Sequence, residues 1–163
     1  MSMVKRIALA FSLIGILAAV SAAQQAQPVN ASMSGSMTNG QEKKSLYARL
    51  GGYDAVAAVV DDFIARLVAD KQLAKFFGGH SEDSLNKIRQ HIVNQFCAAA
   101  GGPCLYTGRD MKTTHKGLQI TGDHWDAAAK HLVDTLDKFK VPKVEKDELL
   151  AFVTSLRKDI VEK

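Results

Sequence analysis

The fold is decided by the stretch Tyr106-Thr107-Gly108-Arg109-Asp110-Met111-Lys112-Thr113-Thr114-His115-Lys116-Gly117-Leu118, which holds one histidine near its end. A helical pattern ends before it at Gly101-Gly102-Pro103, and another opens after it at Thr121-Gly122-Asp123. His115 therefore lies in a short connecting segment between two strongly apolar helices. A lone histidine in a loop is by itself more often a solvated or hydrogen-bonded side chain than a ligand. The sequence on both sides of His115 therefore has to indicate whether this residue is a ligand or an ordinary loop histidine.

Long helical patterns flank this stretch on both sides. Apolar residues recur with the i, i+3, i+4, i+7 period of an amphipathic helix within Tyr53–Asp70 and Ser84–Ala100. The same period continues through Asp123–Lys140, where Phe139 is expected to face inward, and through Glu145–Glu162. No alternating strand pattern is present, so the sequence predicts an all-α domain whose helices meet at glycine-rich corners.

Composition excludes few functions. The chain has 163 residues, 47% of them hydrophobic and 23% charged, which is typical of one globular domain. The formal charge of +4 includes Lys5 and Arg6 at the N-terminus, and without them it falls to +2. No basic cluster remains that would favour nucleic acid as a partner.

The first residues have the pattern of a secretory signal peptide. Lys5 and Arg6 precede the apolar run Ile7–Val20, and small residues follow at 21–23. A membrane anchor is the alternative, although the run is short for a spanning helix of about 20 residues. We expect 1–23 to be a cleaved signal peptide, 24–44 a flexible polar leader and 45–163 the folded domain. The mature protein is then exported, periplasmic in a bacterium, and free of the membrane.

Two cysteines, Cys97 and Cys104, bracket a short loop. An oxidising compartment permits a disulfide between them, and two free thiols are the open alternative. The chain has no Cys-x-x-Cys-His motif, so covalent attachment of a c-type haem is not indicated.

The folded part carries an ordered set of short motifs, each weak alone and specific together. They are Leu46-Tyr47, Leu50-Gly51-Gly52, Val60-Asp61-Asp62-Phe63, Phe76-Phe77, Gly101-Gly102-Pro103, Tyr106-Thr107-Gly108-Arg109, Met111-Lys112, His115, Leu118 and Ile120-Thr121. From residue 45 to about residue 161, this set resembles the group I truncated haemoglobins. The resemblance implies a truncated globin-like two-over-two helical sandwich around a haem, with the haem (haem b, iron) held non-covalently.

By this resemblance, His115 is the proximal ligand of the haem iron. A neutral imidazole ligates iron through one ring nitrogen, and a haem also needs an apolar slot and cations near its propionates. The expected haem contacts are Phe63, Phe77, Ile88, Ile92, Phe96, Leu118 and Trp125, with Tyr106, Arg109 and Lys112 near the propionates. Core packing is the plainer reading of the apolar residues, and solvation that of Arg109 and Lys112.

The distal side departs from the family pattern. Ile64 stands where many members have a tyrosine that hydrogen-bonds bound oxygen, and Ile88 and Ile92 cannot donate either. Since one such hydrogen bond contributes about 1 kcal/mol or more, we expect weak retention of oxygen. His91 stands where some relatives carry a histidine that binds the iron as a sixth ligand. It is a possible distal ligand, or it points outward to a propionate or to solvent.

The expected function is reversible binding of a diatomic gas, O2, NO or CO, at a haem iron. One alternative is a six-coordinate bis-histidyl haem protein for electron transfer. Another is an NO dioxygenase or peroxidase-type enzyme, which would need an unidentified electron donor because the chain shows no reductase domain. A helical module without haem is the fourth reading. No nucleic acid partner is expected, and no feature fixes the oligomeric state, for which a monomer is the expectation.

Overall fold

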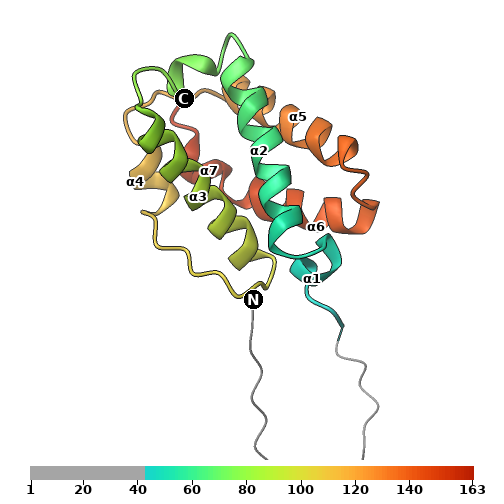
Figure 1. The fold of residues 1–163 in the computed structure, drawn as a ribbon. Helices are drawn as coiled ribbons and strands as arrows, with labels where there is room; N and C mark the ends of the chain where they lie inside the picture. The colour runs from blue at the N-terminus through green and yellow to red at the C-terminus, as the bar shows by residue number, and fades with distance from the viewer. Residues whose placement is uncertain (1–42) are drawn as a thin grey trace, which may run out of the picture. The chain divides into compact units, whose positions relative to one another are not determined.

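The structure is a computed structural model that describes residues 43–163. The signal peptide predicted at 1–23 and nearly all of the leader predicted at 24–44 lie outside the described residues. The described part contains helices and irregular connections and has no strand, so the predicted all-α class is confirmed (Figure 1). In chain order the elements are α1 (Leu46–Leu50), α2 (Tyr53–Ala69), the 3-10 turn η1 (Ala74–Phe76), α3 (Glu82–Ala99), α4 (Met111–His115), α5 (Gly122–Lys138), α6 (Lys143–Ser155) and α7 (Arg157–Ile160).

Hydroxyl caps fix where three of these helices begin. Ser45 Oγ accepts a hydrogen bond from the N–H of Ala48 at the start of α1. Ser81 Oγ accepts from Ser84 at the start of α3, and Thr121 Oγ1 does the same in α5. Each hydroxyl satisfies one of the N–H groups that a helix leaves unpaired in its first turn. Because Ser81 is the cap, α3 begins two residues before its predicted start at Ser84.

Helix α2 is the centre of the domain. It packs against α3 on one side and against α5 on the other (Figure 1). The core between them is apolar and fully buried at Val60, Val93, Leu132 and Leu136. Burial of such side chains contributes about 1.5 to 3 kcal/mol each. Val60, Leu132 and Leu136, which the sequence predicted as inward, lie in this core, whereas Val68, on the same predicted face of α2, is 42% exposed.

A polar contact also joins α2 to α5. Asp62 accepts hydrogen bonds from Arg66 Nε at 2.7 Å and from Thr135 Oγ1 at 3.0 Å, and it also accepts from Lys138 Nζ. Thr135 is completely buried, so this bond satisfies a hydroxyl that has no access to water. The hydrogen bonds from Lys138 and Arg66 lower the pKa of Asp62 to about 2.

The prediction of one continuous last helix over Glu145–Glu162 is wrong. The structure divides this stretch into α6 and α7, with Leu156 between them. Ser155 Oγ donates to the carbonyl oxygen of Phe152, the acceptor that the N–H of Leu156 would use in a continuous α-helix. That N–H bonds to Val153 instead. A serine side chain that competes for the backbone in this way favours the end of a helix.

The predicted inward position of Phe139 is also wrong. Its side chain is 41% exposed. Phe139 follows the last residue of α5 and forms its C-cap, so the helical period that places Leu132 and Leu136 in the core no longer applies to it. The Lys138 ammonium lies 5.8 Å from the centre of its ring.

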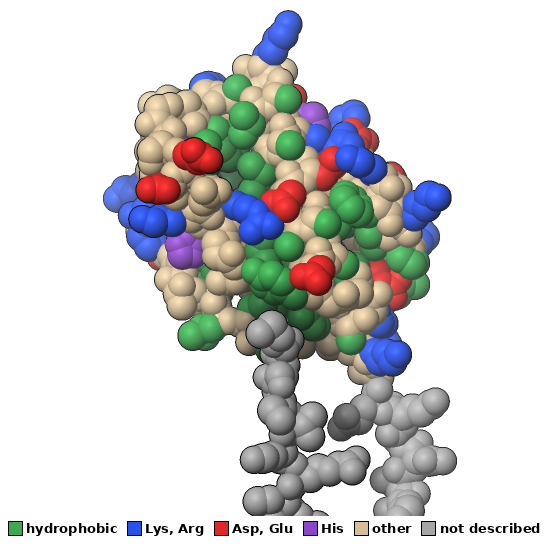
Figure 2. Space-filling model, viewed as in Figure 1, with side chains coloured by type: hydrophobic (Ala, Val, Ile, Leu, Met, Phe, Trp, Pro, Cys, Tyr) green, Lys and Arg blue, Asp and Glu red, His purple; other side chains and the backbone are tan. Residues whose placement is uncertain are grey.

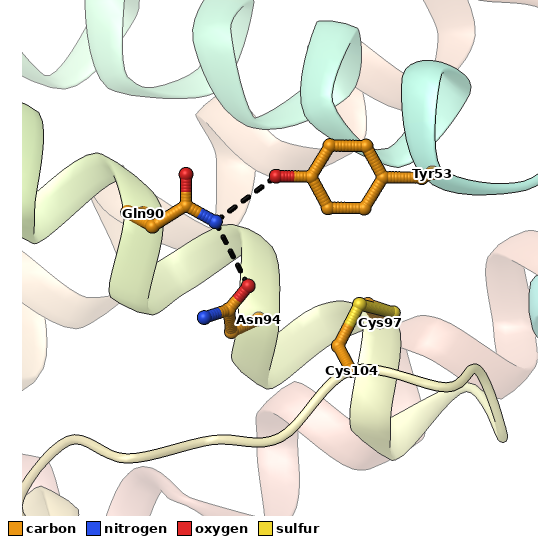
Figure 3. The surroundings of a disulfide bond; sticks show 5 residues. All are labelled: Tyr53, Gln90, Asn94, Cys97 and Cys104. Carbon is orange, nitrogen blue, oxygen red and sulfur yellow. Dashed lines mark hydrogen bonds between the residues drawn. A yellow bond between two sulfur atoms is a disulfide. The ribbon is translucent and has the colours of Figure 1, made fainter.

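Cys97 and Cys104 form a disulfide (Figure 3). The sequence left both a disulfide and two free thiols open, and the structure contains the disulfide. It joins the end of α3 to the chain that leads to α4, and Cys97 is completely buried. Two turns earlier in α3, the Gln90 amide donates to Tyr53 Oη of α2 at 3.0 Å and to Asn94 Oδ1 within α3 at 2.8 Å. The disulfide and the bond to Tyr53 fix α3 against its neighbours.

The surface of the domain carries charges of both signs. On the face drawn in Figure 2, hydrophobic side chains reach the surface between Lys, Arg, Asp and Glu side chains. Among the helices of residues 43–163, none combines the length and the apolar character that crossing a membrane requires.

Candidate functional site

His115 is the last residue of α4, a helix of five residues. Asp110 caps this helix by accepting a hydrogen bond from the N–H of Thr113 at 2.8 Å, which holds the pKa of the Asp110 carboxyl below its usual value. The His115 ring is half-buried, and its Nδ1 lies 2.8 Å from the carbonyl oxygen of Met111. A carbonyl oxygen only accepts, so Nδ1 carries the ring proton and Nε2 keeps a free lone pair. This is the tautomer of a histidine that ligates a metal through Nε2.

The segment after His115 is held by Glu162. Its carboxylate accepts hydrogen bonds from the N–H of Gly117 at 2.5 Å and of Gln119 at 2.7 Å, and both bonds keep the pKa of Glu162 below its usual value. The N–H of Glu162 in turn donates to Ile120, which is buried. The chain just after His115 is therefore fixed from two directions. Sequence reasoning missed this role, because a glutamate at the end of a predicted helix gives no signal of a distant backbone partner.

Tyr106 shapes the loop before α4. Its hydroxyl donates to the carbonyl oxygen of Arg109 at 2.6 Å, and burial raises its pKa. The ring lies so close to Gly108 that a Cβ on that residue would come within 2.4 Å of the hydroxyl oxygen. The predicted contact of Tyr106 with a propionate stays a prediction, since its proton is engaged by the backbone here. Arg109 and Lys112 are exposed, as groups near propionates at a haem edge need to be.

Helix α3 supplies the predicted distal residues. The His91 side chain is exposed, and its ring lies edge-on to Tyr106 with 6.1 Å between ring centres. The distal helix and the loop before α4 are thus side by side. Ile88 and Ile92 are half-buried on the same helix, and Ile64 is half-buried on α2. None of these three isoleucines can donate a hydrogen bond.

The other predicted contacts differ in their surroundings. Phe63, Phe77 and Trp125 are half-buried, Phe77 as the C-cap of η1, and Leu118 is 42% exposed. Phe96 is buried in the core, edge-on to Phe152, and lines a small apolar cavity together with residues of α2, α5 and α6. None of the other predicted haem contacts lines that cavity. Phe96 belongs to the core cluster against which Phe63 and Ile92 also pack, and its predicted contact with a haem stays a prediction.

The chemistry of the site fits a haem. Among residues 43–163, no three His, Cys, Asp or Glu side chains come together in a way that could hold a bare metal ion. A haem brings four ligands of its own and needs one strong axial ligand from the protein. His115, with Nε2 free and Nδ1 bonded to Met111, offers that single ligand.

Comparison with known proteins gives the family. The family model described as Bacterial-like globin matches residues 45–162. The group 1 truncated hemoglobin GlbN of Mycolicibacterium paratuberculosis is 40% identical over 119 residues, which cover 73% of this chain and 85% of that protein. This chain belongs to the group I truncated haemoglobins. It is therefore a haem-binding globin, as the order of its motifs predicted.

Solved structures of truncated haemoglobins share the fold. The Fe(III) form of the truncated hemoglobin of Tetrahymena pyriformis matches with a TM-score of 0.67 and 28% identity, over 74% of this chain and all of that one. The 2/2 hemoglobin of a Synechococcus species, solved in the cyanomet state with covalently attached heme, matches with a TM-score of 0.67 and 31% identity over the same shares. The predicted two-over-two class is confirmed. The electron-transfer and enzymatic alternatives gain no support from these relatives.

Proposed function

We propose that this truncated haemoglobin holds a non-covalent haem b through His115 and binds a diatomic gas reversibly. The observation that carries the proposal is the 2.8 Å hydrogen bond between His115 Nδ1 and the Met111 carbonyl oxygen. This bond fixes the ring orientation, leaves Nε2 unprotonated and makes it a stronger ligand. Asp110 at one end of α4 and Glu162 beyond the other end support the same ring indirectly.

In this proposal, the side chains around His115 exclude water from the haem and balance the charge of its propionates. A haem bound here supplies an iron with one coordination position open to a small gas molecule. Phe77, Ile88 and Ile92 keep water away from the apolar part of the site. Arg109 and Lys112 balance the charge of two propionates at an exposed edge.

Non-covalent binding is supported by the cysteines. Both are joined in the disulfide, so neither offers a thiol for attachment to a vinyl group. The Synechococcus relative was solved with covalently attached heme, so extraction of this haem by acidified organic solvent is the decisive check. Haem that leaves with the solvent supports the proposal, and haem that stays with the polypeptide contradicts it.

The apolar distal side determines which gas is retained. Ile64, Ile88 and Ile92 offer no donor to a polar bound ligand, whereas CO needs little stabilisation of this kind. One missing hydrogen bond of about 1 kcal/mol corresponds to roughly fivefold weaker retention of oxygen. We infer a protein whose affinity for CO or NO exceeds its affinity for O2 by more than in relatives with a distal donor.

Export is part of the proposal. Residues 1–23 have the pattern of a signal peptide, and a disulfide is stable in an oxidising compartment rather than in the cytosol. The test is the mass of the mature chain and its fraction in cells that produce the full sequence. Removal of about 23 residues and recovery outside the cytoplasm are expected. A full-length cytoplasmic protein contradicts export.

The test of the ligand is His115→Gly with and without added imidazole. The variant is expected to bind haem at least tenfold more weakly, and imidazole is expected to restore binding by filling the space of the lost ring. His80→Gly, at an exposed corner, serves as the control and is expected to behave as the unchanged protein. Full haem affinity in His115→Gly without imidazole contradicts the proposal.

A further inference from the structure

The segment 103–109, between the end of α3 and the cap of α4, has few attachments to the rest of the domain. Among the residues that the structure describes, none of its backbone groups is hydrogen-bonded to another backbone group. The carbonyl oxygen of Arg109 accepts bonds from side chains that are three and five positions away in the sequence. The Cys97–Cys104 disulfide is the bond that ties this segment to α3 (Figure 3).

The segment meets α3 at two points. At the first, Cys104 is bonded to Cys97 near the end of the helix. At the second, the ring of Tyr106 lies edge-on to that of His91 with 6.1 Å between ring centres. Between these points the chain runs back along α3 toward α4 (Figure 1). Because Tyr106 is two residues from Cys104, and each residue spans at most about 3.6 Å, the bridge limits how far Tyr106 can move away from the helix.

The two cysteines differ in their access to solvent. Cys97 is completely buried, whereas Cys104 is half-buried. Leu105, next to Cys104, is 75% exposed, more than any other large hydrophobic side chain that the structure describes. An irregular chain with unpaired backbone groups and a protruding apolar side chain is a form in which a peptide adds to a partner protein. These features make Cys104 the sulfur that a partner can reach.

We propose that a dithiol protein opens this disulfide by attack on Cys104 Sγ and thereby releases the segment 103–109. The thiolate of the partner bonds to Cys104 Sγ as the S–S bond breaks, and the electron pair passes to Cys97 Sγ, which takes up a proton. The second thiol of the partner attacks the mixed disulfide and releases Cys104, which is protonated in turn. Two electrons and two protons reach the globin, and the partner ends as a disulfide.

The opened form keeps the core of the domain. A neutral thiol at Cys97 behaves as a small hydrophobic side chain and can stay buried. The end of α3 is also held without the bridge: the N–H of Tyr47 donates to the carbonyl oxygen of Ala100 at 2.7 Å, and that of Gly102 donates to Cys97 at 2.8 Å. Reduction therefore frees the segment 103–109 and leaves α3 in place.

The consequence for the haem site follows from the order of the chain. Asp110, which caps α4, comes directly after the freed segment, and His115 is the last residue of that helix. With the bridge open, Tyr106 is also free to leave His91. We therefore expect the reduced protein to lose haem faster, an effect that rests on the proposed ligation by His115.

The exchange step is tested on the CO complex of the haem-loaded protein. A thioredoxin whose second active-site cysteine is replaced by serine is expected to be trapped as a mixed disulfide at Cys104, identified by the mass of the joined peptides. Intact thioredoxin is expected to reduce the bridge at least tenfold faster than dithiothreitol at equal dithiol concentration. Leu105→Ser is expected to slow thioredoxin at least threefold and to leave the rate with dithiothreitol unchanged. Val144→Ser, on a 60% exposed side chain of α6, is the matched control and is expected to change neither rate.

The release of the segment is measured by ¹⁵N relaxation of the same CO complex. The order parameters of residues 104–109 are expected to fall from about 0.85 to below about 0.6 on reduction, while those of α2 stay unchanged. In the ferric state, Cys104→Ser is expected to transfer haem to an acceptor apoprotein at least threefold faster than the unchanged protein. Asp62→Asn lowers stability without touching the segment; it is expected to keep the order parameters of 104–109 and to change haem transfer less than twofold.

Three results overturn the inference. They are the absence of a mixed disulfide at Cys104, equal rates of reduction by thioredoxin and dithiothreitol, and a segment 104–109 that stays rigid after reduction. Equal haem transfer from Cys104→Ser and Asp62→Asn contradicts the link to the haem site. Failure of the haem site itself is recognised separately, because a protein without haem gives no CO spectrum, whereas exchange at Cys104 is detected by mass in either case.

Discussion

His115 Nδ1 donates a 2.8 Å hydrogen bond to the carbonyl oxygen of Met111, one turn earlier in α4. This single bond determines which ring nitrogen is free for a metal. It depends on α4 keeping its short helical turn, which the cap by Asp110 begins and Glu162 secures beyond its end. The His115 ring is therefore only as rigid as the backbone on its two sides.

Replacement of Glu162 by glutamine tests this support. The amide keeps the shape of the carboxylate but has one acceptor where two N–H groups, of Gly117 and Gln119, need one each. We expect a lower Tm and faster transfer of haem to an acceptor apoprotein. Because the pKa of Glu162 is lowered in the folded state, the difference from the unchanged protein is largest above pH 4.5 and shrinks as the pH falls further. Glu148→Gln, on the other side of the domain, is the control; equal haem loss from both variants contradicts the assignment.

His91→Ala tests whether this histidine is a sixth ligand. If His91 coordinates the iron, the reduced protein without added gas has sharp, split visible bands, and the variant has one broad band. The variant also binds CO faster, since no internal ligand has to leave first. Lys87→Ala, another exposed change on α3, is expected to alter neither property. A reduced spectrum that is the same with and without His91 rules out coordination by this residue.

Removal of the disulfide is expected to destabilise the domain. The bridge joins residues seven positions apart, and the chain-entropy relation for so short a loop gives about 2 to 3 kcal/mol. Cys104→Ser removes the bridge without disturbing the buried Cys97 side chain, and chemical unfolding measures the loss. Thiol labelling is the direct check, with no label expected before reduction and two labels after it. Labelling of both cysteines without reduction shows that no bridge is present.

Asp62→Asn probes the contact between α2 and α5. The carboxylate accepts from Arg66, Thr135 and Lys138, and its pKa is about 2 in the folded protein against a usual 3.8. A lowered folded-state pKa adds stability that is present above the unfolded value and lost as the pH falls from about 4 to about 2. After allowance for screening by solvent, the variant is expected to lose about 1 to 2 kcal/mol at pH 7.

Denaturant titrations at pH 7 and pH 3 measure this difference. Asp147→Asn removes a surface pair with Lys143 and is expected to change stability by about 0.5 kcal/mol or less at either pH. An Asp62→Asn variant whose destabilisation does not shrink at low pH contradicts the proposed charge network.

The sequence predicted those parts of the fold that depend on period and spacing. Apolar repeats located α2, α3 and α5 to within about two residues, and the motif order around His115 gave the family. A hydrogen bond made by a single side chain leaves no periodic pattern in the sequence, so bonds of this kind could not be predicted. The division between α6 and α7 depends on one serine hydroxyl, Ser155, that takes the carbonyl of Phe152. Phe139 follows the pattern of α5 by count but lies beyond its last helical residue.

The candidate site shows the same limit. The sequence predicts His115 as the iron ligand because the motifs around it resemble those of the group I truncated haemoglobins, since a lone histidine between two helices is more often an ordinary loop residue. The role of Glu162, which bonds to Gly117 and Gln119, depends on contacts between residues more than 40 positions apart. The spacing of residues in a single sequence does not reveal contacts between such distant positions. Only the three-dimensional structure shows these long-range contacts.

Ligation of a haem by this protein is tested most directly by the visible absorption spectrum of the purified protein after reconstitution with haem and reduction by dithionite, before and after addition of CO. We expect the spectrum of a histidine-ligated ferrous haem that changes fully to that of a CO complex, with one haem per chain. A protein that takes up no haem, or whose reduced haem does not respond to CO, contradicts it.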